Sequence, residues 1–323
     1  MRKEDFRIVF MGTPEFAVAS LEALLKAGYN IVAVVTAPDK PAGRGKMLTE
    51  PEVKVFAKKH NLNILQPEKL KDPHFVETLK ELNPNLGIVV AFRMLPEIIW
   101  ALPKLGTINL HASLLPQYRG AAPINHAIIN GETETGVTTF FLSHEIDTGN
   151  IILQQKIDIG IDTTAGQLHD RLMTEGAKVV LATMQAIEKG NVTPISQESL
   201  IAQGNEVKTA PKIFKEDCRI NWNKSTHEIY NFIRGLSPYP ASFTILKPGD
   251  GKEEHVKIYK SGVEKLKHEN EPGDIYTDNS KKLGVWVKDG IIWVLELQIA
   301  GKKRMLVKDF LNGFKIPDGS KML

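Results

Sequence analysis

Residues 7–36 read RIVFMGTPEFAVASLEALLKAGYNIVAVVT and decide the fold of the first part of the chain. They begin with an apolar strand, pass through a tight Gly-Thr-Pro-Glu turn and continue in a helical pattern that Gly28 ends. Thr13 is expected to cap this helix, because its hydroxyl can accept a hydrogen bond from a free backbone N–H at the helix start. Pro14 is expected at the first helical position, where its lack of a backbone N–H costs no hydrogen bond. The β-branched run at 31–35 is typical of a parallel strand that is buried on both faces.

The same strand signal recurs at Leu86–Ala91 and, more briefly, at 106–110, with helical patterns between the strands. Strands that alternate with helices favour a doubly wound α/β fold, so we expect a Rossmann-like domain with a mostly parallel sheet. The first turn is not G-x-G-x-x-G, and no acidic residue closes the second strand. NAD binding is therefore not expected, and no P-loop is present either.

The remainder of the chain has a different pattern. A helical repeat covers 165–189, the polar stretch 190–208 is the best linker candidate, and 211–236 reads as helical. Short strand signals follow at 241–246, 256–260, 273–276, 283–287 and 291–298. Short strands separated by Pro, Gly, Asp and Asn suggest a small OB-like β-barrel. We expect a first domain over 1–189, a linker over 190–208 and an OB-like C-terminal domain over 209–323.

Composition excludes several classes of protein. The chain has 323 residues, of which 42% are hydrophobic and 24% charged, and only one cysteine, which excludes a disulfide framework or a thiolate metal site. The charged start and the lack of a long apolar run predict neither a secretion signal nor a membrane span, so a cytoplasmic protein is expected. Residues 209–323 contain 20 Lys and Arg against 15 Asp and Glu, a net charge of +5. This excess suits a phosphate-rich partner, although charge alone favours the more ordinary explanation of a solvated lysine-rich surface.

Three polar residues between 108 and 151 form the candidate catalytic group. Asn109 and His111 stand two apart at the end of a predicted strand, so both side chains point to one side at the carboxyl edge of the sheet. Asp147 lies in a Ser-His-Glu-Ile-Asp-Thr-Gly loop after a strand-like run. An amide and an imidazole can stabilise the oxyanion of an acyl transfer, and a carboxylate can orient the imidazole and accept a proton.

Taken singly, each of these residues also has an ordinary structural interpretation. His111 is then a hydrogen-bonded core histidine, and Asn109 and Asp147 are turn formers. The Asp-Thr-Gly triplet occurs in aspartic proteases, but a single copy argues against that class. His126 and His144 are near in sequence, yet neither has a partner at a spacing typical of zinc, so no metal site is expected.

The full pattern Asn-x-His-x-Ser-Leu-Leu-Pro-x-Tyr-Arg-Gly (109–120), with its downstream Asp-Thr-Gly, resembles the folate-dependent formyltransferases. Four further segments narrow the resemblance to the methionyl-tRNA formyltransferases. These are the opening Phe-Met-Gly-Thr-Pro-Glu-Phe-Ala-Val (10–18), the loop Ala-Pro-Asp-Lys-Pro-Ala-Gly-Arg-Gly-Lys (37–46), and the C-terminal Ala-Gly-Lys-Lys-Arg-Met (300–305) with Asp-Phe-Leu-Asn-Gly (309–313).

This resemblance implies an activity, substrates and site residues. The activity would be transfer of formyl from 10-formyltetrahydrofolate to the α-amino group of methionine on initiator tRNA, with Asn109, His111 and Asp147 catalytic. Folate contacts would come from Ser113, Leu114, Leu115, Pro116, Phe92, Arg93 and Leu95. Contacts with tRNA would come from Lys40, Arg44, Lys46, Lys302, Lys303 and Arg304. Arg119 would brace the active-site loop through backbone carbonyls, and the enzyme would be a cytoplasmic monomer.

Other acceptors and classes stay open at this point. A formyltransferase that acts on a sugar-nucleotide amine shares the Asn-x-His core but lacks the basic loop at 37–46. A purine-pathway enzyme would end near residue 200, and a formate-releasing hydrolase would use the same polar residues on water. A non-catalytic RNA-binding protein is disfavoured because all three polar positions are intact.

Overall fold

The computed structural model describes the chain except for residues 1, 43–46, 203, 205 and 250–251. Its residues gather into two compact units. The first comprises Met1–Gly120, Thr135–Ile157 and His169–Thr209, and the second comprises Ala121–Glu134, Asp158–Leu168 and Ala210–Leu323. Two short segments of the N-terminal half therefore belong with the C-terminal residues.

A seven-stranded sheet, in the order β10-β9-β7-β6-β1-β2-β5, organises the described part of the first unit. The five strands from β5 to β7 run parallel to their neighbours, whereas β9 is antiparallel to β7. Their bounds are β1 (Ile8–Gly12), β2 (Ile31–Val35), β5 (Ile64–Leu65), β6 (Leu86–Val90), β7 (Thr107–His111), β9 (Glu134–Phe141) and β10 (Ile151–Asp158). The predicted Rossmann-like fold with a mostly parallel sheet is confirmed.

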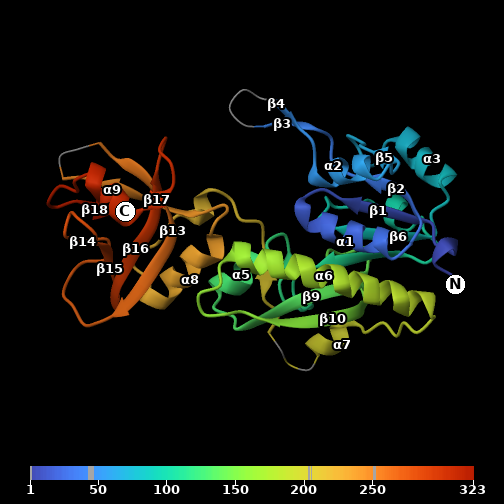
Figure 1. Ribbon diagram of the computed structural model, residues 1–323. Coiled ribbons are helices and arrows are strands. Elements are labelled where there is room, and N and C mark those ends of the chain that lie inside the picture. The colour runs from blue at the N-terminus through green and yellow to red at the C-terminus, as the bar shows by residue number, and fades with distance from the viewer. Residues whose placement is uncertain (1, 43–46, 203, 205, 250–251) are drawn as a thin grey trace. The chain divides into compact units, whose positions relative to one another are not determined.

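Helices pack against this sheet (Figure 1). They are α1 (Glu15–Lys26), α2 (Glu52–Lys59), α3 (Pro73–Glu81), α4 (Glu97–Trp100) and α6 (Ala165–Glu188), and a short turn of 3-10 helix covers Lys3–Asp5. On one face, Met11 of β1 packs with Phe75 and Leu79 of α3 in an aliphatic and aromatic core. A hairpin of β3 (Lys40–Ala42) and β4 (Met47–Thr49) projects from the edge of the unit (Figure 1).

The start of α1 differs by one residue from the prediction. Pro14 is the N-cap, with an extended backbone at φ −81° and ψ 174°, and no side chain bonds the first free N–H groups. Thr13 is therefore not the cap and Pro14 is not the first helical residue, because the fixed φ of proline is as compatible with an extended residue as with a helical one. Gly28 ends the helix as predicted, at a φ of +81° that favours glycine.

The second unit contains an antiparallel sheet in the order β14-β15-β16-β13-β12-β18, with β17 added to β16. The bounds are β12 (Ser242–Lys247), β13 (Glu254–Lys265), β14 (Ile275–Thr277), β15 (Leu283–Val287), β16 (Gly290–Ile299), β17 (Met305–Leu306) and β18 (Lys321–Met322). A bridge between Asp274 and Lys321 brings the two ends of this sheet together. All five predicted strands are present, and the near-closed sheet confirms the OB-like barrel.

The helix predicted over 211–236 is only partly correct. α8 covers Thr226–Leu236 and starts at Ser225, whose hydroxyl bonds the backbone N–H of Glu228. The residues before it hold only a 3-10 turn at Glu216–Cys218, and Ile220 donates its N–H to the Phe243 carbonyl at 2.8 Å. This stretch forms no continuous helix, because apolar residues such as Ile220 and Trp222 bury singly against the barrel rather than as one helical stripe.

Short elements complete the described chain. They are β8 (Arg119–Gly120), α5 (Pro123–Ile129), α7 (Gln197–Ile201), β11 (Thr209–Ala210) and α9 (Val307–Gly313). α7 lies within 190–208, so the segment that reads as a linker contains a helical turn. It also contains a β-bridge, because Ile195 and Ile151 exchange backbone hydrogen bonds of 2.8 Å.

Candidate active site at the carboxyl edge of the sheet

β7 positions two of the three predicted catalytic residues. Asn109 pairs with Val89 of β6 on one side and with Phe140 of β9 on the other, and His111 is the last residue of the strand. His111 is 7% exposed, and Asn109 is half-buried. The amide of Asn109 has no hydrogen-bond partner among the described residues, so its N–H groups are available to a substrate oxygen.

The structure brings Asp147 to His111. The Oδ2 atom of Asp147 lies 3.7 Å from Nδ1 of His111, and both side chains are about nine-tenths buried. On its other side, Nε2 of His111 lies 2.8 Å from the carbonyl oxygen of Tyr118, which can only accept, so Nε2 carries a hydrogen. Nδ1 is therefore the ring nitrogen left for chemistry, and it faces a carboxylate at a distance that is longer than a direct hydrogen bond.

Strained backbone surrounds this pair. Ala91, Tyr118 and Asp147 have φ of +47°, +59° and +55°, in the left-handed region that residues other than glycine rarely adopt. Ala91 follows β6, Tyr118 provides the carbonyl to His111, and Asp147 provides the carboxylate. Strain of this kind persists only where neighbouring bonds enforce it, and it gathers at functional sites.

The segment predicted to contact folate after His111 is mainly a hydrogen-bonded loop. Ser113 is fully buried and donates its hydroxyl to the Gln117 carbonyl at 2.6 Å, while Thr138 on β9 donates to the Ser113 carbonyl at 2.6 Å. Leu115 and Pro116 are also buried. Leu114 is half-buried, so among the side chains predicted here it keeps the most surface for a ligand.

The second predicted folate segment follows β6 and has three different environments. Leu95 is buried in the core beside α3, and Phe92 is half-buried against the same cluster. The exposed Arg93 donates to the carbonyls of Glu68, at 2.8 Å, and of Pro67, and its guanidinium lies 5.7 Å from the Phe92 ring centre. These bonds tie the end of β6 to the segment that follows β5.

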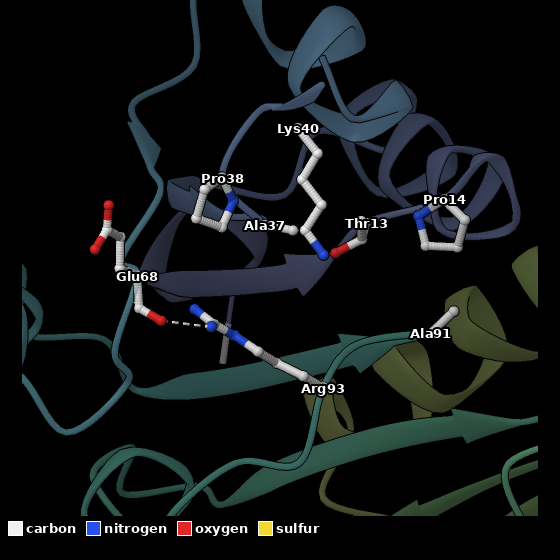
Figure 2. A pocket seen from close by; sticks show the side chains of 8 residues that line it. All are labelled: Thr13, Pro14, Ala37, Pro38, Lys40, Glu68, Ala91 and Arg93. Carbon is white, nitrogen blue, oxygen red and sulfur yellow. Dashed lines mark hydrogen bonds between the residues drawn. The ribbon is translucent and has the colours of Figure 1, made fainter. Parts of the chain in front are cut away.

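A cavity of about 590 Å³ opens at this edge of the sheet (Figure 2). Its lining residues follow the carboxyl ends of β1, β2 and β6, with one residue from beyond β5: Thr13, Pro14, Ala37, Pro38, Lys40, Glu68, Ala91 and Arg93. The chain leaves β1 for β2 on one side and later returns to β6 on the other, so the cavity lies at the point where the strand order reverses. Ligands of open α/β sheets bind at such points.

Lys40 starts the hairpin of β3 and β4, and a compact ion cluster fastens the base of that hairpin. Nζ of Lys54 on α2 lies 2.6 Å from Asp39 and 3.0 Å from Glu50, and Gln66 donates to Asp39 at 2.8 Å. The hydrogen bond from Lys54 lowers the pKa of Asp39, and the bond to Asp39 raises the pKa of Lys54. Both therefore stay ionised around neutral pH. Arg44 and Lys46, also predicted for tRNA, lie outside the described residues.

The C-terminal cations predicted for tRNA are exposed near the end of β16. The guanidinium of Arg304 already has partners within the protein. Glu296 accepts two hydrogen bonds of 2.6 Å from it, and it lies 4.3 Å from the Tyr259 ring centre. The hydrogen bonds that Arg304 donates to Glu296 raise the pKa of Arg304. In the described part of the chain, the side chains of Lys302 and Lys303 have no ion-pair partner, so these two cations are available to an anion.

The contacts of Arg119 near the site differ from what the sequence indicated. Arg119 bonds the side-chain oxygen of Gln197, at 3.0 and 2.7 Å, and not backbone carbonyls. Gln197 itself belongs to the stretch predicted as a linker, where no sequence signal marked it. His144 is exposed and lies 3.6 Å from Glu97, and its ring lies 5.4 Å from that of Trp100.

Neither a metal centre nor a membrane helix is found within the ranges that the structure describes. No three His, Cys, Asp or Glu residues there form a group that could hold a metal ion. His126 bonds the Pro211 carbonyl at 3.0 Å. No described helix combines the length and apolarity that crossing a bilayer requires.

Comparison with known proteins gives matches along most of the chain. A family model for formyl transferase matches residues 6–184, and one for the formyl transferase C-terminal domain matches 212–315. A methionyl-tRNA formyltransferase of Phocaeicola vulgatus is 58% identical over 323 residues, and one of Bacteroides thetaiotaomicron is 53% identical over 322 residues; each alignment covers 100% of both chains.

Solved structures of lower identity share the fold. WlaRD, described as a sugar 3N-formyl transferase, superposes with a TM-score of 0.65 at 23% identity, over 92% of this chain and 99% of that one. HypX from Aquifex aeolicus, in complex with tetrahydrofolic acid, gives a TM-score of 0.63 at 17% identity, over 95% of this chain and 47% of that one.

Proposed function

The chain belongs to the formyl transferase family, within it to the methionyl-tRNA formyltransferases, and we propose that Asn109, His111 and Asp147 perform its reaction. The enzyme transfers the formyl group of 10-formyltetrahydrofolate to the α-amino group of methionine on initiator tRNA. One observation supports this assignment best. Nδ1 of His111 lies 3.7 Å from the Asp147 carboxylate, and both lie near the amide of Asn109, which has no hydrogen-bond partner among the described residues.

The reaction needs an oxyanion site and a proton acceptor. The neutral α-amine attacks the formyl carbon, and the carbonyl electron pair moves to oxygen, which gives a tetrahedral intermediate. Asn109 donates a hydrogen bond to that oxygen, and Nδ1 of His111 donates another when the ring is protonated. The 3.7 Å between Nδ1 and Oδ2 of Asp147 is too long for a direct hydrogen bond and too short for an atom to lie between them, so both groups can contact one substrate atom or water from the same side.

Proton transfer completes the reaction. The attacking nitrogen loses a proton to Asp147, directly or through water, and that proton passes on to the nitrogen of the departing folate as its bond to the formyl carbon breaks. The products are formylmethionyl-tRNA and tetrahydrofolate, so atoms and charge balance without a covalent enzyme intermediate. The bond from Gly120 N–H to Oδ2 of Asp147, at 3.0 Å, fixes the carboxylate in place.

The substrates are assigned to different parts of the molecule. We assign residues 1–189 to folate and catalysis, 190–208 to a connecting segment, and 209–323 to tRNA. Leu114 and Phe92 are the half-buried apolar side chains suited to the folate ring. The buried Ser113, Leu115, Pro116 and Leu95 hold their segments in shape, and Arg93, which we also assign to the folate site, ties the end of β6 to the Glu68 carbonyl. Lys40 borders the cavity at the sheet edge, which we assign to the acceptor end of the tRNA.

Two further cations, Lys302 and Lys303, are proposed to bind tRNA phosphates, with Arg304 more restricted by Glu296. Arg44 and Lys46 are proposed for the same partner because of their place in the hairpin sequence. We also propose that the enzyme works in the cytoplasm as a monomer. Size-exclusion chromatography with light scattering would detect a dimer, which would contradict the monomer.

A two-acceptor assay tests the proposed acceptor. The enzyme is supplied with 10-formyltetrahydrofolate and either methionyl initiator tRNA or a 4-amino-sugar nucleotide, and formylated product is quantified. We expect product only from the methionyl-tRNA. Formylation of the sugar alone would contradict the acceptor and leave the cations of the hairpin and of the barrel without a function.

A further inference from the structure

Gln197 is a fully buried glutamine in a segment whose other described residues are exposed or half-buried. It is the first residue of the short helix α7, and it is 1% exposed, whereas its neighbours Glu198 and Ser199 are exposed. The backbone pairing of Ile195 with Ile151 brings this segment to the start of β10, directly after the Asp147 loop. A buried amide requires hydrogen-bond partners, because leaving it unpaired is unfavourable.

Every hydrogen-bonding position of the Gln197 amide is occupied. Its nitrogen donates to the backbone carbonyls of Asp147, at 2.9 Å, and of Gly149, at 2.8 Å. Its oxygen accepts from Nε and from a terminal nitrogen of Arg119, at 3.0 and 2.7 Å. Two donors and two lone pairs are the full capacity of a carboxamide, so the side chain has one preferred orientation.

These bonds close a ring around the catalytic carboxylate. Arg119 bonds Gln197, Gln197 bonds the carbonyl of Asp147, and the N–H of Gly120 bonds the carboxylate of the same residue at 3.0 Å. The backbone of Asp147 is thus connected through Gln197 to Arg119, and its side chain is bonded to the neighbouring Gly120. The loop before Asp147 is exposed at residues 144–146 and is braced there by local bonds, such as that from the Thr148 hydroxyl to the Glu145 carbonyl at 3.1 Å.

The ring explains how Asp147 keeps its strained backbone. A φ of +55° is unfavourable for aspartate, and a loop without external bonds would relax from it. Relaxation would rotate the carboxylate relative to Nδ1 of His111. A displacement of about 1 Å at a catalytic group can lower a rate on the order of 100-fold.

We propose that Gln197 is a positioning residue for formyl transfer, which holds the Asp147 loop so that its carboxylate faces His111. This inference rests on the proposed role of Asp147. It assigns to the connecting segment a part in the chemical step, although Gln197 itself touches no substrate.

Gln197→Glu is the sharpest test, because it retains the size of the side chain and the acceptor for Arg119. It replaces the N–H donors by a carboxylate oxygen that faces two carbonyls. We expect kcat to fall by about 10- to 100-fold, with KM for methionyl-tRNA and for folate changed less than about threefold. Glu198→Gln makes the reverse change on the exposed neighbour and should leave kcat unchanged.

A double-mutant cycle separates positioning from general destabilisation. Single-turnover rates are measured for wild type, Gln197→Glu, Asp147→Asn and the double variant, with thermal melting as a check of folding. If Gln197 acts through Asp147, its substitution should have almost no further effect on the residual rate of Asp147→Asn. Fully additive losses, or a wild-type kcat for Gln197→Glu, would overturn the inference.

A second variant keeps the test decisive if Gln197→Glu folds poorly. Arg119→Met removes the other anchor of Gln197 and should lower kcat several-fold at unchanged KM; wild-type kcat would contradict the proposal. The experiments distinguish failure of the catalytic role of Asp147 from failure of the positioning role of Gln197. Full activity of Asp147→Asn would reject the catalytic role itself, whereas loss in Asp147→Asn with normal Gln197→Glu would reject only the positioning role.

Discussion

Two parts of the same sheet edge are built in opposite ways. The corner around His111 and Asp147 is buried, its backbone is strained, and hydrogen bonds from distant segments fix its polar atoms. In the hairpin that begins at Lys40, the side chains whose exposure is described are exposed, and an ion cluster around Lys54 fastens its base. The difference follows from the tasks that we assign. A reacting atom must be placed within about half an ångström, whereas a cation needs only to reach a phosphate.

The largest effect is expected from Asp147→Asn, which keeps the shape of the side chain but removes its charge and basicity. Formyl transfer should fall roughly 1000-fold or more, because the proton acceptor beside His111 is lost. The affinity for methionyl-tRNA should stay near that of the wild type, as measured by filter binding. A variant with normal kcat would remove the basis for treating this corner as the catalytic one.

Asn109→Ala should have the next largest effect. The amide has no partner among the described residues of the protein, so its removal leaves no buried group unpaired and mainly removes a donor to the oxyanion. We expect a loss of roughly 100-fold in kcat and little change in thermal stability. A large fall in melting temperature with proportionate loss of activity would instead indicate a structural asparagine.

Lys54→Met tests the hairpin that begins at Lys40. It removes the cation that holds Asp39 and Glu50 together, so the base of the hairpin loses its anchor. KM for methionyl-tRNA should rise about 10-fold, while kcat at saturation changes less than about twofold. Lys58→Met is the matched control, because Lys58 is more exposed and, within the described part of the chain, its ammonium pairs with Glu50 and not with Asp39. If both variants behave alike, the cluster does not position the hairpin.

The smallest effect is expected at the C-terminal cations. Lys302→Ala and Lys303→Ala should each raise KM for tRNA a few-fold and lower the slope of log affinity against log salt by about one. Arg304→Ala serves as a comparison, since its guanidinium is occupied by Glu296. An unchanged salt slope in the two lysine variants would exclude them from the phosphate contacts.

The sequence predicts what local rules determine. The apolar run at 31–35 is the strand β2, and the spacing of Asn109 and His111 places both on β7 at the sheet edge. The meeting of His111 with Asp147 depends on a fold that no spacing encodes, and only the family resemblance anticipated it. Where a local pattern competed with burial against the barrel, as over residues 211–225, the sequence prediction of a helix was wrong.

Gln197 shows why the remaining part of the site was not predictable. Its partners are residues 119, 147 and 149, all distant in sequence, and its surroundings read as a polar connection. A buried glutamine has no periodicity that marks it, because its burial results from four hydrogen bonds and not from an apolar stripe. Similarly, the strained φ of Tyr118 and Asp147 follows from tertiary bonds and not from residue type.

The most direct test of the account measures single-turnover formyl transfer at methionyl-tRNA concentrations far above KM, in Asn109→Ala and in Lys54→Met. We predict that Asn109→Ala stays roughly 100-fold slow, because its defect lies in the chemical step. Lys54→Met should recover the wild-type rate, because its defect lies in binding. Recovery of both variants, or persistent loss in both, would contradict the division of this sheet edge into a catalytic corner and a recognition hairpin.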